Sequence, residues 1–221
     1  MLCLEAQKRH NSIRLVVFDL DGTLTKSPNI WRYLHLKLGT WKYGRVYARK
    51  YVKGEITYRE WAELDSRLWR GTGLTEVLNA TDRIEYTDGA ARTIRRLRDA
   101  GLKVGIVSAG LSILADRAGK DLGADVVISN RLIESGGVLT GEIDTRVAVD
   151  DKAEIIRDLA TSLGISMSEV AVVGDNAFDM PAGAGLKVAF NPRNKEAQDA
   201  ADFVVKGDDL SVILELLLLD G

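Results

Sequence analysis

The sequence has little cysteine and little histidine: one cysteine, Cys3, and two histidines, His10 and His35, in 221 residues. A single cysteine excludes an intramolecular disulfide and a cysteine-rich metal centre, and it suits a reducing compartment. Two histidines are too few for a histidine-rich metal site. We therefore expect a cytoplasmic protein.

Long apolar runs are also absent. The most apolar stretch, residues 212–219, is far shorter than the roughly 20 residues that span a bilayer. Residues 1–10 carry charges before any apolar stretch of signal-peptide length. We expect no membrane association and no export, and we expect residues 212–219 to form a final helix packed on the core, with a homodimer contact as the alternative.

No charge of one sign predominates. The chain has 30 basic and 32 acidic residues, so no overall field would hold it to nucleic acid or to an anionic surface. With 221 residues and 46% apolar content, the chain can bury one substantial core and a smaller accessory domain. Nucleic acid is therefore not the expected partner.

Short apolar runs alternate with patterns of helical period. Four runs lack strict alternation, which is typical of strands covered on both faces; they are residues 13–18, 103–107, 126–128 and 170–173. Helical patterns end at Gly101 and Gly164, as at helix C-termini. This alternation predicts an α/β fold with a Rossmann-like, doubly wound parallel sheet.

One segment interrupts the alternation. Residues 27–81 carry helix-like patterns without a clear strand, which predicts a small helical cap inserted after the first strand. Residues 1–26 and 82–221 would then form the catalytic core. Within that core, residues 130–143 have two apolar stretches around Gly136 and Gly137, a pattern that predicts a β-hairpin.

Polar side chains follow the predicted strands, at the edge where doubly wound sheets bind ligands. They are Asp19, Asp21, Ser108, Asp175 and Asp179. Four carboxylates in one crevice repel one another unless a cation lies among them, and oxygen ligands favour Mg²⁺ over zinc. The sequence therefore predicts a Mg²⁺ site, to which only some of the carboxylates bind directly.

Phosphoryl transfer requires a nucleophile, positive charge and a proton donor for the leaving oxygen. Asp19 would attack phosphorus and form an aspartyl-phosphate. Asp21 would protonate the leaving oxygen and later deprotonate the hydrolytic water, while Gly22 allows a tight turn. These two carboxylates are the predicted catalytic residues.

A phosphate cradle is predicted from three further residues. The Ser108 hydroxyl and the Ala109 amide would donate to phosphate oxygens, helped by the following helix N-terminus, and Lys152 would balance negative charge. Taken singly, an aspartate after a strand is usually a turn or cap residue, and Lys152 is most simply a solvated lysine. Their combination and order carry the prediction.

The chain resembles the haloacid dehalogenase superfamily of phosphatases, and within it the phosphoserine phosphatases. The first motif, DxDGT[LV]T, is matched by the highly specific run at residues 19–25. The remaining similarity lies in residues 107–110, 152–156 and 174–180, and in 130–132 and 184–190 for the phosphoserine phosphatase branch. It covers essentially the whole chain and implies a Mg²⁺-dependent phosphatase acting through an aspartyl-phosphate.

The resemblance also implies roles for individual residues. Mg²⁺ would be held by the Asp19 carboxylate, the Asp21 main-chain carbonyl and Asp175. Asp179 would support the site through water or Lys152. The supporting residues are Gly22, Asn176 and Asp179, and the helical insertion corresponds to the cap of the family.

Three positions depart from the phosphoserine phosphatase pattern. Phe178 replaces an asparagine that helps hold phosphate. The glutamate for the substrate ammonium falls at Pro28, and the arginine for its carboxylate falls at Asp65. Phosphoserine would lose two contacts of about 2 kcal/mol each, unless Arg59 or Arg67 substitutes.

Residues 26–53 combine basic side chains with aromatic ones and contain no acidic residue. This composition fits a solvated, packed cap face, attraction of a small phosphorylated substrate, or binding of single-stranded nucleic acid. Trp61 and Trp69 are interpreted as packing residues.

The sequence thus favours hydrolysis of a small phosphorylated metabolite, with phosphoserine as the best single substrate. A sugar phosphate or a nucleoside monophosphate is the alternative within hydrolases. A non-catalytic binding protein that uses the basic aromatic cap is the alternative from another class, and the intact Asp19, Asp21, Lys152 and Asp175 argue against it.

Overall fold

The computed structural model describes residues 13–218, so Cys3 and His10 lie outside the described residues. A single seven-stranded sheet has the order β4-β3-β2-β1-β5-β6-β7. Its strands are β1 (Leu15–Phe18), β2 (Lys103–Leu111), β3 (Val126–Ser135), β4 (Val138–Asp144), β5 (Val170–Gly174), β6 (Leu186–Phe190) and β7 (Phe203–Val205). All neighbours pair in parallel except β3 and β4, which confirms the predicted α/β fold.

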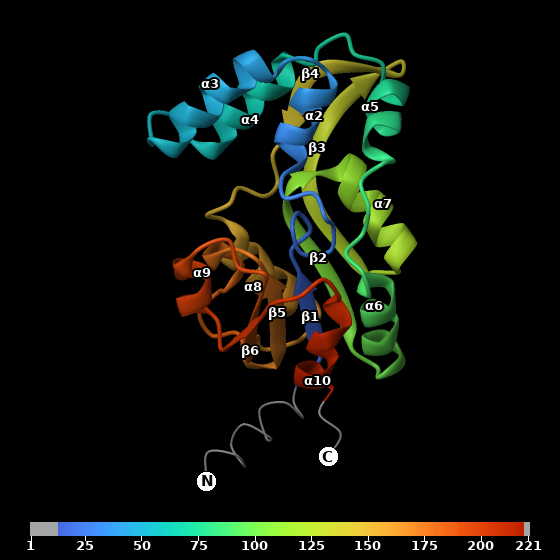
Figure 1. Cartoon of the computed structure of the whole chain (residues 1–221), viewed down its shortest axis with the longest axis vertical. Coiled ribbons are helices and arrows are strands. Elements are labelled where there is room, and N and C mark those ends of the chain that lie inside the picture. The colour runs from blue at the N-terminus through green and yellow to red at the C-terminus, as the bar shows by residue number, and fades with distance from the viewer. Residues whose placement is uncertain (1–12, 219–221) are drawn as a thin grey trace.

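Helices cover both faces of the sheet (Figure 1). On one face lie α6 (Ala90–Asp99) and α7 (Ser112–Leu122), and on the other lies α8 (Lys152–Ser162). Successive residues of β1 point to opposite faces, so Val16 and Phe18 belong to one apolar cluster with Ile94 of α6, while Leu15 belongs to another with Ile156 of α8. Burial on both faces explains why the strands read as continuous apolar runs.

Four helices lie between β1 and α6: α2 (Ile30–Lys37), α3 (Trp41–Val52), α4 (Tyr58–Arg67) and α5 (Leu74–Thr81). We call them the cap helices. In Figure 1, α3 and α4 lie side by side beyond the sheet. Helix α4 starts with a capping box, in which Thr57 and Glu60 satisfy each other's backbone N–H groups.

The β3–β4 hairpin contacts the segment that joins α4 and α5. Backbone bonds of 2.9 Å run from the Gly71 amide to the Leu139 carbonyl and from the Leu139 amide to the Thr72 carbonyl. The Ser66 hydroxyl also donates to the Gly141 carbonyl, at 3.1 Å. The hairpin is therefore joined to the cap helices as well as to the sheet.

The chain closes with short helices: η1 (Met167–Glu169), η2 (Ala177–Asp179), α9 (Lys195–Ala200), η3 (Leu210–Ile213) and α10 (Leu214–Leu217). Instead of the single final helix expected over residues 212–219, the described part is a 3-10 turn followed by one helical turn. Leu210, Ile213 and Leu217 are buried, so this segment packs on the core, as expected. Within residues 13–218, no helix has both the length and the apolar character needed to cross a membrane.

Candidate active site

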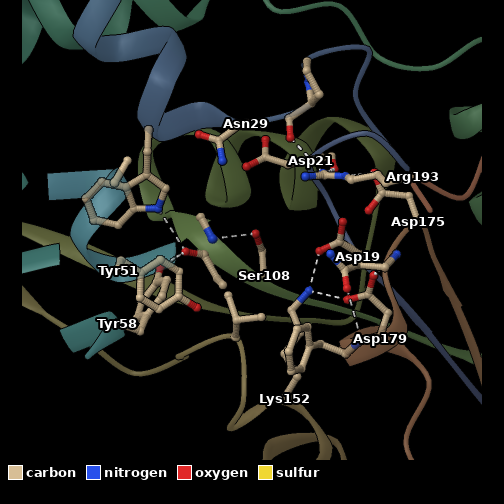
Figure 2. Close-up of a pocket in the computed structure, with 18 of the residues that line it drawn as sticks. Asp19, Asp21, Asn29, Tyr51, Tyr58, Ser108, Lys152, Asp175, Asp179 and Arg193 are labelled. Carbon is tan, nitrogen blue, oxygen red and sulfur yellow. Dashed lines mark hydrogen bonds and ion pairs between the residues drawn. The ribbon is translucent and has the colours of Figure 1, made fainter. Parts of the chain in front are cut away.

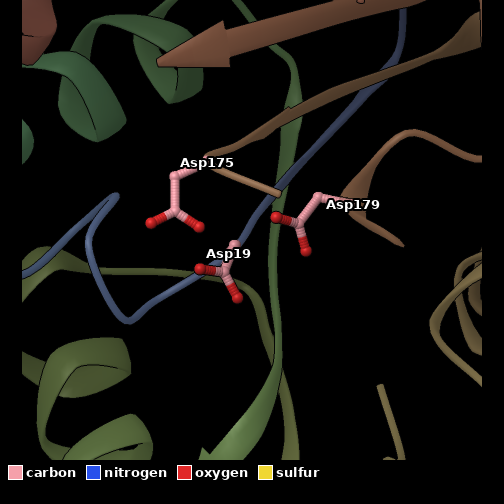
Figure 3. Close-up of side chains that lie close together, drawn as sticks. All are labelled: Asp19, Asp175 and Asp179. Atoms are coloured by element: carbon pink, nitrogen blue, oxygen red, sulfur yellow. The ribbon is translucent and has the colours of Figure 1, made fainter. Parts of the chain in front are cut away.

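Asp19 and Asp175 meet because β1 and β5 are neighbours in register. Phe18 pairs with Val173, and the Asp19 amide donates to the Val173 carbonyl at 2.9 Å. Each aspartate follows the last residue of its strand, so both side chains project from the same edge of the sheet, together with Asp179 (Figure 3). Both carboxylates are buried.

Two glycines make this close approach possible. A Cβ on Gly174 would lie 2.4 Å from the Asp179 side chain. Gly22 has φ +89°, and a Cβ there would lie 2.4 Å from Asp175 Oδ2. Gly22 therefore supports the site through both its backbone conformation and its lack of a side chain, beyond the tight turn expected from sequence.

Lys152 lies between two of the carboxylates (Figure 2). It is the first residue of α8, and its Nζ donates to Asp19 Oδ1 at 2.5 Å and to Asp179 Oδ1 at 2.6 Å. Burial lowers the pKa of Lys152, but the negative charges of Asp179 and Asp19 outweigh it and hold this pKa above its ordinary value. Lys152 is therefore a buried cation, not the solvated lysine of the plainer interpretation.

Both carboxylate oxygens of Asp179 accept hydrogen bonds from other residues of the site. Its Oδ1 accepts from Lys152, and its Oδ2 accepts from the Asn176 amide at 2.9 Å. Asn176 in turn caps η2 by accepting from the Phe178 amide at 3.3 Å. Both residues thus have contacts that suit a supporting role. The Phe178 ring is half exposed and lines a cavity that Asp19, Asp21 and Lys152 also line.

Asp21 lies at the N-terminus of α2. Its Oδ2 accepts from the Ile30 amide at 3.0 Å, while its buried Oδ1 has no hydrogen-bond partner in the described residues. Burial raises the pKa of Asp21 to about 7, against the lowering effect of the Ile30 amide. A carboxyl with this pKa can give up and take back a proton near neutral pH.

The residues predicted to bind phosphate occupy a different place in the strand from the one expected. Strand β2 continues to Leu111, so Ser108 and Ala109 lie within it instead of after it, and α7 begins only at Ser112. The pairing of β2 with β3 shifts register between Val107 and Leu111, which frees residues 108–110 from the regular ladder. The buried Ser108 hydroxyl accepts from the Gly110 amide at 2.9 Å and lines the cavity.

The carbonyl of Ala109 joins the cap helices to the sheet. It accepts from Trp31 Nε1 at 3.1 Å, from Asn130 Nδ2 at 3.0 Å and from the Tyr58 hydroxyl. Asn130 also binds the backbone of Val147, with its Nδ2 donating to the carbonyl and its Oδ1 accepting from the amide. These bonds fix where the cap helices stand over the strand edge.

Arg193 is a site residue that the sequence reasoning missed. Its guanidinium donates to Asp175 Oδ2 at 2.5 Å, to the Asp21 carbonyl at 2.6 Å and to the Pro28 carbonyl at 2.8 Å. It follows β6, the neighbour of β5, so its place just after a strand was a usable signal. The residues predicted from the sequence at those positions carry acidic or hydroxyl side chains, and Arg193 carries neither.

The acidic cluster fits a divalent cation. Asp19, Asp175 and Asp179 each offer an oxygen within 4.8 Å of the others, and such all-oxygen sets suit Mg²⁺. Burial raises the pKa of Asp175 to about 7, the Asp19 charge acts in the same direction, and Arg193 opposes both. Arg193 binds two of the three ligands expected for Mg²⁺, the Asp21 carbonyl and Asp175.

Neither candidate replacement for the missing arginine reaches the cavity. Arg59 binds Asp151 at 2.6 Å and Arg67 approaches Glu63 at 3.4 Å, and neither lines the cavity. At the arginine position, Asp65 is buried with its Oδ2 3.0 Å from His35 Nε2. The position that would bind a substrate carboxylate is therefore part of the cap interior.

Comparison with known proteins shows the family of the chain. The sequence model of the haloacid dehalogenase-like hydrolase family matches residues 16–184. A phosphoserine phosphatase from Archaeoglobus fulgidus is 35% identical over 93% of this chain, which spans 60% of that relative. One from Methanocaldococcus jannaschii is 31% identical over 92% of this chain and 97% of its own length.

Solved structures agree with the fold. A substrate-bound phosphoserine phosphatase complex is 28% identical, with a TM-score of 0.80 over 92% of this chain and 97% of its own. A phospho-aspartyl intermediate analogue of phosphoserine phosphatase gives a TM-score of 0.79, with 92% and 98% covered. The chain therefore belongs to the haloacid dehalogenase-like hydrolase family, as a phosphatase-like member similar to the phosphoserine phosphatases.

Proposed function

We propose that this protein hydrolyses phosphomonoesters of small metabolites in the cytoplasm, through an aspartyl-phosphate on Asp19. The proposal rests on the buried side chains at the carboxyl ends of the strands. There Lys152 lies 2.5 Å from Asp19, and Asp19, Asp21 and Lys152 line one cavity. This arrangement supplies a nucleophile, a cation and a proton donor in one enclosed place.

The reaction takes two steps. In the first, an Asp19 carboxylate oxygen attacks phosphorus, the ester bond from phosphorus to oxygen breaks, and the leaving oxygen takes a proton from Asp21. In the second, Asp21 removes a proton from water, which attacks phosphorus. The acyl-phosphate bond then breaks, Asp19 returns as a carboxylate, and inorganic phosphate leaves.

The other residues bind and orient the phosphoryl group. Lys152, the Ser108 hydroxyl and the Ala109 amide bind its oxygens, and all three residues line the cavity. Asp19, the Asp21 carbonyl and Asp175 would hold Mg²⁺, which would supply positive charge to the phosphoryl oxygens. Asp179 positions Lys152, as its 2.6 Å contact suggests.

Asp19→Asn tests the proposal, with p-nitrophenyl phosphate as the substrate. We expect turnover to fall by at least about 10³-fold because the nucleophile is lost, while circular dichroism shows an intact fold. Asp99→Asn, at an exposed position on α6, is the matched control and should keep full activity. Undiminished turnover by Asp19→Asn would remove Asp19 as the nucleophile.

Phosphoserine is the substrate named for the relatives and is the first metabolite to test. A homodimer stays a prediction.

A further inference from the structure

The cavity beside Asp19 has a charged end and an apolar end. It is about 250 Å³ in volume. Its charged lining residues all belong to the strand-edge cluster already described: Asp19, Asp21, Lys152, Asp175, Asp179 and Arg193. Within residues 13–218, every side chain that the cap helices contribute to its lining is uncharged; these are Trp31, Ala48, Tyr51, Val52, Tyr58 and Trp61.

The aromatic rings pack against one another as a wall. The Tyr58 ring stands edge-on to Trp61, with centroids 5.3 Å apart, and Trp31 lies 4.9 Å from Trp61. The polar tips of Tyr58 and Trp31 are bound to the Ala109 carbonyl. Because these polar groups are engaged by the backbone, the wall offers mainly apolar ring surface to a ligand.

Four charged side chains of the cap helices have partners away from this wall. Arg32 lies over the Trp41 ring at 5.4 Å, and Lys42 lies over Tyr43 at 4.7 Å. Arg59 binds Asp151, and Asp65 lies against His35. A carboxylate or ammonium placed at the apolar end would be desolvated without a charged partner, which is unfavourable by several kcal/mol.

The geometry points to a phosphomonoester whose organic group is small, uncharged and apolar, and this inference rests on the proposed function. The phosphoryl group binds at the Asp19 end, and the organic group lies against the wall of Trp31, Tyr58 and Trp61. The size agrees, because an apolar cavity of roughly 150 Å³ holds a benzene ring, which leaves space for a phosphoryl group.

Matched pairs of esters test the charge preference directly. Isobutyl phosphate has methyl groups in place of the ammonium and carboxylate of phosphoserine, and 3,3-dimethylbutyl phosphate is the neutral isostere of phosphocholine. We expect kcat/KM to be at least about tenfold higher for the neutral member of each pair, with benzyl phosphate a good substrate. A tenfold ratio of kcat/KM corresponds to about 1.4 kcal/mol, which is a modest share of the cost of an unpaired buried charge.

The outcomes are distinct. If phosphoserine exceeds isobutyl phosphate, or phosphocholine exceeds its neutral counterpart, the inference is wrong, while Asp19-dependent turnover of p-nitrophenyl phosphate would leave the proposed function standing. If the wild-type protein turns over no ester, the proposed function fails. Calorimetric binding of the matching non-hydrolysable phosphonates to the wild-type protein then still decides the charge preference.

A variant at the apolar end that does not disturb the core tests where the organic group lies. Val52, at the end of α3, lines the cavity and is 83% exposed, so Val52→Asn should fold and should lower kcat/KM for benzyl phosphate about fivefold relative to that for isobutyl phosphate. Val212→Asn, at a 45% exposed position outside the cavity lining, is the control and should leave the ratio unchanged. An unchanged ratio in Val52→Asn would contradict the placement of the organic group.

Discussion

The guanidinium of Arg193 and the carboxylate of Asp175 face each other at 2.5 Å, and the same guanidinium binds the Asp21 carbonyl at 2.6 Å. A positive side chain therefore holds two of the three groups that the family resemblance assigns to Mg²⁺. Arg193 binds Oδ2 of Asp175 and one lone pair of the Asp21 carbonyl, so lone pairs remain for Mg²⁺, but the positive guanidinium beside them repels the cation.

Arg193→Gln should therefore bind Mg²⁺ more tightly than the wild-type protein, since the positive charge beside these two groups is removed. We expect the dissociation constant to fall about tenfold, equivalent to about 1.4 kcal/mol, as measured by calorimetric titration of the substrate-free protein. Arg92→Gln, which removes an exposed ion pair with Asp209, is the control. Weaker Mg²⁺ binding by Arg193→Gln would mean that Arg193 supports the metal-bound state.

Gly22→Ala should be far more harmful than Gly71→Ala, although both glycines have a positive φ, at +89° and +85°. Both substitutions incur the backbone cost of about 1 kcal/mol. Only at Gly22 would the new Cβ lie 2.4 Å from Asp175 Oδ2, whereas at Gly71 nothing lies within 4 Å. Thermal unfolding and p-nitrophenyl phosphate turnover check this, and equal effects in the two variants would refute the role given to Gly22.

The Asp65 and His35 pair predicts a pH-dependent contribution to stability. Burial raises the pKa of Asp65, against the lowering by its contacts with His35 and Trp61. The folded protein thus holds the proton more tightly than the unfolded chain, so the stability contributed by protonated Asp65 is present at low pH. It is lost as the pH rises from the ordinary value of 3.8 through the raised folded value.

Urea unfolding of the wild-type protein and Asp65→Asn between pH 4 and pH 8 measures this contribution. The free energy of unfolding of the wild-type protein, minus that of the variant, should decrease as the pH rises. This subtraction cancels the titrating groups that do not contact Asp65, because these have the same surroundings in both proteins. A difference that grows with pH would show that the pKa of Asp65 is lowered, not raised.

Strand-edge residues could be predicted because their position follows from local sequence and from a general rule. Asp19 and Asp175 each follow an apolar run that had to be a central strand, and parallel strands end at one edge. Lys152 opens a helix whose period is plain in the sequence. For these residues, the position of the strand or helix in the sequence is almost enough to predict the position of the side chain in the site.

Other residues depend on contacts that no local pattern encodes. Arg193 meets the Asp21 carbonyl across 172 positions of sequence, after a loop in which Asn191 has φ 47°. The burial of Asp65 against His35 requires α2 and α4 to pack together. Ser108 was expected after its strand, but β2 runs on to Leu111 through an irregular stretch that apolar runs alone do not reveal.

The bonds between Leu139 and the segment joining α4 to α5 bear on how a substrate enters. A lid held only by two flexible linkers could swing while the sheet stays still. Here the segment between α4 and α5 shares backbone bonds with β4, which is itself paired with β3. Any movement of these helices that admits substrate or releases phosphate would therefore also displace the hairpin, so that stiffening the hairpin would slow such a movement from a place remote from the chemistry.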